Sequence, residues 1–141
     1  MKQVIETSKG SLFFRPKYLY QGRKKIGKKI SRTNLLTTRN ILKKSKIRWG
    51  LIFGTLLGAF REKDFITHDD DVDIFVYFED KKIFIDLLYE FKKYGFEVVR
   101  FEKDSLLSIM RKNEQTDFYF FKKTLFGRRC LDYYIPKIYF K

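Results

Sequence analysis

Residues 69–78 read Asp-Asp-Asp-Val-Asp-Ile-Phe-Val-Tyr-Phe, so that four carboxylates stand at the mouth of an apolar run. The run predicts a strand at 72–78, because its residues are mostly β-branched or aromatic. In an extended chain Asp71 and Asp73 share one face, about 6.6 Å apart, while Val72 and Ile74 point to the opposite face and the core. An unpaired carboxylate inside an apolar strand is costly. Asp73 therefore indicates a site rather than a solvated acidic turn.

Two carboxylates that point to one place repel each other unless a cation lies between them. Hard divalent ions such as Mg²⁺ accept an oxygen-rich site of this kind, and substrate phosphates complete their coordination. A calcium-binding loop is the main competing interpretation, since Asp69, Asp71 and Asp73 match its first three ligand positions. That interpretation fails, because Ile74 stands where the loop requires glycine and Asp80 stands where it requires glutamate.

A third carboxylate would strengthen the prediction of a metal site. Asp117 opens the apolar run Phe118–Phe121, so it too lies at the start of a predicted strand. Alone it would be a turn residue. If its strand is adjacent to that of Asp71 and Asp73, the three side chains converge.

The segment Gly54-Thr55-Leu56-Leu57-Gly58 lies between a predicted strand at 47–53 and a short helix that begins near Leu56. Glycine lets the backbone approach a ligand closely, and a helix N-terminus offers free N–H groups to a phosphate. A tight turn without a ligand is the plain alternative. The acidic strand that follows favours a phosphate-binding turn.

The remaining segments alternate between helical and extended patterns. We expect helices from Asn34 and from Asp80, which would cap the second helix and lead it to Gly95. Further strands are expected at 96–101, 106–110 and 117–121. This order predicts an α/β (α+β) fold, in which one small domain has a mixed sheet flanked by helices.

The net charge of +14 is unevenly distributed along the 141 residues. Residues 1–50 contain 15 Lys and Arg but a single acid, whereas residues 51–141 contain 16 of each sign. We therefore expect a basic N-terminal segment, residues 1–33, attached to a domain of residues 34–141. Cys130 is the one cysteine, and the sequence has no apolar run of roughly 18 residues and no secretory signal. These features predict a soluble, cytoplasmic protein.

The motifs around the acidic run resemble the signature of the LicD family of phosphocholine transferases, to which fukutin is related. The resemblance is carried by the residues 54–61 (Gly-Thr-Leu-Leu-Gly-Ala-Phe-Arg), 65–66 (Phe-Ile) and 68–74 (His-Asp-Asp-Asp-Val-Asp-Ile). The family belongs to the nucleotidyltransferase superfamily, which is recognised by a Gly-Ser/Thr turn, a carboxylate–x–carboxylate strand and a third carboxylate on a neighbouring strand. The resemblance thus implies a nucleotidyltransferase-like sheet.

The resemblance also implies roles for individual residues. Gly54 and Thr55 would hold the phosphates of a donor. Asp71, Asp73 and Asp117 would form the catalytic site and bind Mg²⁺ or Mn²⁺.

Further residues match the family motif beside this site. Asp69 and Asp70 would orient the metal ligands or the acceptor, and Arg61 would contact phosphate or brace the acidic loop. His68 matches a position with an aromatic residue or histidine in the family, which favours a shaping role over that of a general base. Thr67 departs from the family pattern, which usually has proline there.

Members of the family transfer a phospho-alcohol group, such as phosphocholine or a pentitol phosphate, from a CDP-linked donor to a sugar hydroxyl. The resemblance therefore implies a Mg²⁺-dependent transferase that acts in the modification of a surface glycan or lipopolysaccharide. Its partners would be a CDP-linked donor nucleotide and a glycan or glycolipid acceptor. The basic residues 23–29 would add a peripheral contact with an anionic membrane.

Two other functions remain open. A nucleotidyltransferase that modifies a small molecule or a protein would share the Gly-Thr turn and the Asp-x-Asp strand, but not the whole stretch from Arg61 to Asp73. Nucleic-acid binding is suggested by the basic first 50 residues, in which aromatic residues such as Phe13 and Tyr20 are interleaved. Nucleic acid is the less favoured partner, because much of this charge can be a solvated face.

Overall fold

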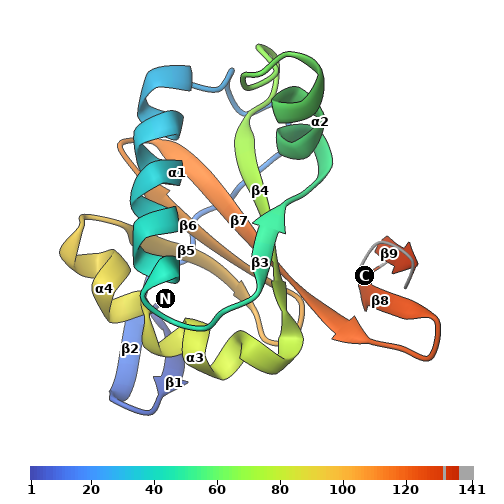
Figure 1. Cartoon of the computed structure of the whole chain (residues 1–141). Helices are drawn as coiled ribbons and strands as arrows, with labels where there is room; N and C mark the ends of the chain where they lie inside the picture. The colour runs from blue at the N-terminus through green and yellow to red at the C-terminus, as the bar shows by residue number, and fades with distance from the viewer. Residues whose placement is uncertain (132, 137–141) are drawn as a thin grey trace.

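The computed structural model describes residues 1–131 and 133–136. In chain order its elements are β1 (Gln3–Thr7), β2 (Gly10–Phe14), α1 (Lys28–Lys43), β3 (Trp49–Leu51), α2 (Phe53–Arg61), β4 (Asp71–Tyr77), the 3₁₀ turn η1 (Phe78–Asp80), α3 (Lys81–Asp86), α4 (Leu88–Lys93), β5 (Glu97–Glu102), β6 (Leu106–Arg111), β7 (Glu114–Lys123), β8 (Gly127–Cys130) and β9 (Tyr133–Pro136) (Figure 1). Within these described ranges, no helix has both the length and the apolar character needed to cross a bilayer.

The central sheet has the strand order β3-β4-β7-β6-β5. β4 and β7 run parallel, whereas the other neighbours in this order run antiparallel. The far end of β7 pairs with β8, and β8 pairs with β9, so the long strand β7 leads into a hairpin (Figure 1). The mixed α/β sheet predicted from the sequence is confirmed, and it forms one small domain.

One face of this sheet builds the hydrophobic core, which α1 and α3 cover. Val72, Ile74 and Val76 of β4 are at most 1% exposed and alternate with half-buried residues. On β7, Phe118 and Phe120 point the same way, and the ring of Phe118 lies 4.6 Å from that of Phe84 on α3. The odd-numbered side chains of β4 and β7 therefore point to the other face of the sheet.

The N-terminal residues share this core rather than standing apart from it. The hairpin β1–β2 contributes Ile5, Leu12 and Phe14, and Ile26 joins them just before α1. The coil of residues 15–27, here called the strap, runs behind the sheet in Figure 1 from this hairpin to the start of α1.

The first long helix, α1, begins at Lys28 and not at Asn34, which the capping pattern indicated. Asn34 lies buried inside the helix, where its Nδ2 donates a hydrogen bond to the carbonyl of Arg111. The start of the helix is held by Glu114 of β7, which accepts hydrogen bonds from the Gly27 N–H (3.0 Å) and the Ser31 hydroxyl (3.2 Å). A carboxylate distant in sequence thus replaces a local cap.

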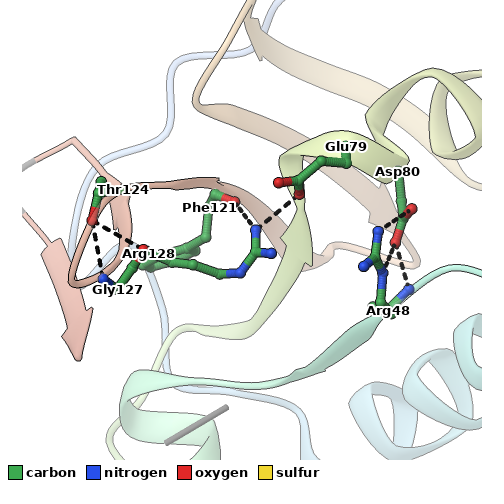
Figure 2. A network of polar contacts seen from close by, with 7 residues as sticks. All are labelled: Arg48, Glu79, Asp80, Phe121, Thr124, Gly127 and Arg128. Carbon is green, nitrogen blue, oxygen red and sulfur yellow. Dashed lines mark hydrogen bonds and ion pairs between the residues drawn. The ribbon is translucent and has the colours of Figure 1, made fainter. Parts of the chain in front are cut away.

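The helical segment predicted from Asp80 to Gly95 is divided into η1, α3 and α4. The Asp80 carboxylate makes no capping hydrogen bond to this segment. It accepts hydrogen bonds from the backbone N–H, Nε and Nη2 of Arg48, each at 2.9 Å (Figure 2). Gly95 follows α4 with φ +87°, the left-handed conformation typical of a helix end.

Candidate active site

Three carboxylates meet on the face of the sheet that does not form the core. Asp71 and Asp73 come from β4, and Asp117 comes from the parallel strand β7, where it is directly opposite Asp73 in the register. One oxygen of each carboxylate lies within 4.8 Å of the others. The structure therefore brings together the three residues that the sequence nominated as metal ligands.

The first turn of α2, which begins at Phe53 and not near Leu56 as the sequence indicated, fixes the position of Asp73. The Thr55 hydroxyl accepts a hydrogen bond from the Asp73 N–H at 2.8 Å, and the Ile52 N–H donates to the Asp73 carbonyl at 3.1 Å. Thr55 is buried. Its side chain thus acts on the backbone of the acidic strand and does not line the pocket described below.

Gly54 lies where the turn comes closest to the acidic loop. A Cβ atom at this position would stand 2.8 Å from Oδ2 of Asp69, closer than side-chain carbons pack. Phe53, just before it, has φ +50°, a strained conformation for a residue with a bulky side chain. The turn is therefore shaped to carry its backbone against the carboxylates.

Burial and mutual repulsion dominate the electrostatics of the site. Burial, with the charges of Asp73 and Asp117, raises the pKa of Asp71 to about 9. Burial and the charge of Asp117 raise the pKa of Asp73 to about 7, although a hydrogen bond from Tyr119 acts in the opposite direction. A cation placed among these carboxylates would relieve their mutual repulsion and favour their ionised state.

Asp117 is fixed from both sides by its neighbours in the sheet. Nη2 of Arg100 on β5 donates to its Oδ2 at 2.8 Å, and Nε2 of Gln115 donates to its Oδ1 at 2.9 Å. Arg100 also donates through Nε to the Ser108 hydroxyl at 2.9 Å. The registers align Arg100, Ser108, Asp117 and Asp73 in one row across the sheet.

The donor set suits a hard divalent cation. Oxygen ligands bind Mg²⁺ or Ca²⁺ at about 2.0–2.6 Å, so two oxygens that share an ion lie at most about 5 Å apart. The separations among Asp71, Asp73 and Asp117 meet this limit. Three carboxylates leave part of an octahedral shell to substrate phosphates or water.

These carboxylates open into a pocket of about 390 Å³. The pocket is also bordered by Asp69, Asp70 and Gly54, by Arg100 and Gln115, by the aromatic residues Phe53, Tyr119 and Tyr133, and by Leu19, Tyr20 and Gln21 of the strap. The sequence did not predict that the strap, Arg100 and the aromatic residues border this pocket. Local sequence patterns reveal neither the order of strands in a sheet nor the path of a coil.

Two predicted residues of the acidic triplet hold the strap. Oδ2 of Asp70 accepts a hydrogen bond from the Gly22 N–H at 2.5 Å, and the carbonyl of Asp69 accepts one from the Ile26 N–H at 2.7 Å. Both side chains also border the pocket.

Arg61 is the predicted residue that lies away from the carboxylates. It is exposed at the end of α2, where its Nη2 pairs with Oε1 of Glu62 at 3.0 Å. It does not border the pocket. His68 is exposed as well and does not border the pocket.

The part of the chain that contains these carboxylates is similar to known proteins. Residues 46–137 match the family model for the LicD/FKTN/FKRP nucleotidyltransferase domain. The lipopolysaccharide cholinephosphotransferase LicD of Haemophilus influenzae is 40% identical over 45 residues, which are 32% of this chain and 17% of that protein.

Two uncharacterized proteins of Rickettsia are similar over a longer stretch. Those of Rickettsia typhi and Rickettsia prowazekii are 39% and 38% identical over 61 residues, or 43% of this chain. The matched stretch makes up 20% and 23% of their lengths, so this chain spans less than a quarter of the curated relatives that it matches.

Proposed function

Because the chain belongs to the LicD/FKTN/FKRP nucleotidyltransferase family, we propose that it is a transferase that moves a phospho-alcohol group from a CDP-linked donor to a sugar hydroxyl. Phosphocholine is the group named for the Haemophilus relative, and a surface glycan or lipopolysaccharide is the acceptor class we infer from it. The observation that carries the proposal is the convergence of Asp71, Asp73 and Asp117 in one polar pocket.

Asp71, Asp73 and Asp117 would hold Mg²⁺ or Mn²⁺. When bound, the ion would neutralise charge on the donor diphosphate and so make its phosphorus accessible to attack. The residues fit this role, because their mutual repulsion is relieved by a cation.

The chain's own groups supply the rest of the chemistry. Gly54 borders the pocket within the first turn of α2, so its backbone would approach the donor phosphates. A carboxylate oxygen of Asp71 or Asp73 would accept the proton of the attacking hydroxyl, whose oxygen bonds to the phosphorus of the phospho-alcohol group while the diphosphate P–O bond breaks and CMP leaves. Arg100 and Gln115 hold Asp117 in place, so that the set is preorganised.

The proposal is tested by ligand binding to the purified protein. CDP-choline, CDP-ribitol, CDP-glycerol, CTP and ATP are screened with Mg²⁺ by thermal shift, and the best ligand is measured by calorimetry. At least one CDP-linked donor should bind only with the metal present. Binding of ATP or CTP in preference to every CDP-linked donor would favour a different nucleotidyltransferase.

The Asp73→Asn variant tests the site itself. It should lose at least about tenfold in metal-dependent donor affinity, since it removes one charged ligand of the cation. Asp104→Asn is the matched control, because Asp104 is an exposed acid that pairs with Lys81 and Lys122 away from the pocket. Equal donor affinity in the parent and in Asp73→Asn would show that Asp73 has another role.

We also propose that an anionic membrane surface is a partner, as expected for an enzyme with a glycolipid acceptor. Three of the basic residues first nominated for this role are engaged within the protein: Arg23 with Asn113, Lys24 with Glu114 and Lys28 with Asp64. The exposed side of α1 offers a better candidate surface. That helix contains no acid, and its Lys29, Arg39 and Lys43 are exposed.

A further inference from the structure

We propose that the strap, residues 15–27, is a wall of the donor site and that Tyr20 stacks on the nucleobase of the donor. The inference rests on the proposed function, since it assumes a nucleotide-linked donor. It concerns residues outside the match to the family model, which begins at residue 46. Tyr20 would therefore be a specificity residue that this chain supplies from its own N-terminal segment.

The strap is built into the site at several points. Its Gly22 N–H donates to Asp70, and the carbonyl of Asp69 accepts from the Ile26 N–H. Both nitrogens Nη1 and Nη2 of Arg23 bind Asn113, the turn residue between β6 and β7, at 2.9 and 3.1 Å.

The two ends of the strap are also tied to the sheet. Near its start, the Lys17 N–H donates to the carbonyl of Val99 on β5 at 2.9 Å. Near its end, Lys24 forms an ion pair with the buried carboxylate of Glu114. A segment held from both ends and in the middle presents its side chains in defined places.

Tyr20 is the aromatic side chain that the strap brings to the pocket. Leu19, Tyr20 and Gln21 border the same pocket as the three carboxylates. The Tyr20 side chain is 52% exposed, so a large part of its surface is open to a ligand. Its ring lies 5.9 Å from that of Tyr18, tilted by 31°, and this neighbour supports its orientation.

A nucleobase is the part of the donor that best matches Tyr20. The carboxylate end of the pocket suits a cation and the donor phosphates. The nucleoside and the alcohol group of the donor would therefore contact the other residues that border the pocket. A planar base gains from an aromatic face, and such stacking contributes substantially to nucleotide binding. Gln21 beside it offers the amide donors and acceptor that a base edge requires.

The test measures binding of CDP and of CDP-choline, each with Mn²⁺, to the full chain by calorimetry. Tyr20→Ala should weaken both ligands by roughly tenfold, because both carry the cytosine base. Tyr20→Phe should bind within about twofold of the parent, since the ring remains. Mn²⁺ alone should bind equally to all three proteins.

Tyr94→Ala is the matched control, because Tyr94 is 47% exposed at the end of α4 and does not border the pocket. It should bind both ligands like the parent. Unchanged CDP affinity in Tyr20→Ala would overturn the stacking role. A loss for CDP-choline alone would overturn it too, and would assign Tyr20 to the alcohol group.

The failure of this inference is distinct from failure of the proposed function. If the parent binds CDP-linked donors and Asp73→Asn does not, whereas Tyr20→Ala binds like the parent, then only the role of Tyr20 is wrong. If the parent binds neither CDP nor any CDP-linked donor, then the proposed function and the role of Tyr20 both fall.

Discussion

The carboxylates of Asp71 and Asp73 make the stability of the metal-free protein depend on pH. Their pKa values in the folded protein are raised to about 9 and about 7, against about 3.9 for an unfolded aspartate. Because the folded protein holds these protons more tightly than the unfolded chain, the raised pKa values stabilise the fold. This contribution is complete below the unfolded pKa and is lost as the pH rises through the folded pKa. We predict that the unfolding temperature in EDTA falls between about pH 5 and pH 9, and that Mg²⁺ or Mn²⁺ reduces this fall at pH 8.

Two variants separate this effect from general alkaline destabilisation. Asp73→Asn removes one titrating group and should flatten the fall in unfolding temperature. Asp104→Asn should retain the parental fall, since ion pairing with Lys81 lowers the pKa of Asp104 rather than raising it. A parental slope in Asp73→Asn would contradict the prediction.

Among the elements, the junction of the strap, α1 and β7 depends on one residue. The Glu114 side chain is 5% exposed and accepts hydrogen bonds from Lys24, from the Gly27 N–H and from the Ser31 hydroxyl. We predict that Glu114→Ala lowers the free energy of unfolding by about 2–3 kcal/mol in urea denaturation. This loss is smaller than the loss expected when one partner of a fully buried ion pair is removed, because Lys24 remains in contact with water.

Glu90→Ala is the control for this prediction. Glu90 pairs with Lys93 on the surface of α4, and such exposed pairs contribute little. Its urea midpoint should match that of the parent. If Glu114→Ala also matched the parent, the start of α1 would not depend on this carboxylate.

A second junction joins the hairpin β8–β9 to the rest of the sheet (Figure 2). Nη1 of Arg128 on β8 donates to Oε2 of Glu79 at 2.8 Å and to the carbonyl of Phe121 at 3.1 Å. Its guanidinium lies 3.6 Å from the ring centroid of Tyr77 at the end of β4. Because β9 follows β8 and carries Tyr133 to the pocket, this junction holds a hairpin that contributes to the site.

We predict that Arg128→Ala speeds amide hydrogen exchange in residues 127–131 by about tenfold or more. Losing the charged hydrogen bond to Glu79 costs about 1.5–3 kcal/mol of local stability. Arg129→Ala is the neighbouring control, since Arg129 is exposed and its Nε donates to the carbonyl of Leu131. Equal exchange in the two variants would show that the hairpin is held by its other contacts.

The same elements show which features a sequence can predict. β4 and β7 were predicted because each contains an apolar run of mostly β-branched or aromatic residues, next to acids that such a run does not explain. The start of α1 was predicted wrongly, because Glu114, which holds it, lies 87 residues from Gly27 in the chain. The hairpin β1–β2 was missed, since its exposed Val4 and Phe13 obscure the alternation.

The sequence predicted the site residues that stand out from their immediate neighbours in the chain. It did not predict the site residues that reach the pocket only through the arrangement of strands and coils. Asp71, Asp73 and Asp117 lie beside apolar runs, where a carboxylate has no local reason to be, although β7 begins at Glu114 and not at Asp117 as predicted. Arg100 reaches Asp117 only because β5, β6 and β7 are adjacent and in one register. Tyr20 lies in a coil without periodicity, so no sequence pattern connects it to the pocket.

On the scale of the whole molecule, the net charge of +14 lies in the first 50 residues, and α1 displays much of it. Lys29, Arg39 and Lys43 are exposed cations of this helix, and the exposed Leu36 lies among them. An anionic bilayer would attract such a helix by about 1 kcal/mol for each cation near its surface. The attraction falls with salt, since the Debye length is about 8 Å near 150 mM.

We predict that the protein binds vesicles containing phosphatidylserine at about 150 mM salt and does not bind neutral vesicles under the same conditions. Changing Lys29, Arg39 and Lys43 together to Glu should weaken this binding by about 100-fold or more, since three attractive charges become repulsive. The same change at Lys92, Lys103 and Lys123 alters the net charge equally and should weaken binding much less, because these exposed cations lie outside α1. Submicromolar DNA binding at this salt, without vesicle binding, would instead assign the basic face of α1 to nucleic acid, and it would leave the carboxylate site as it stands.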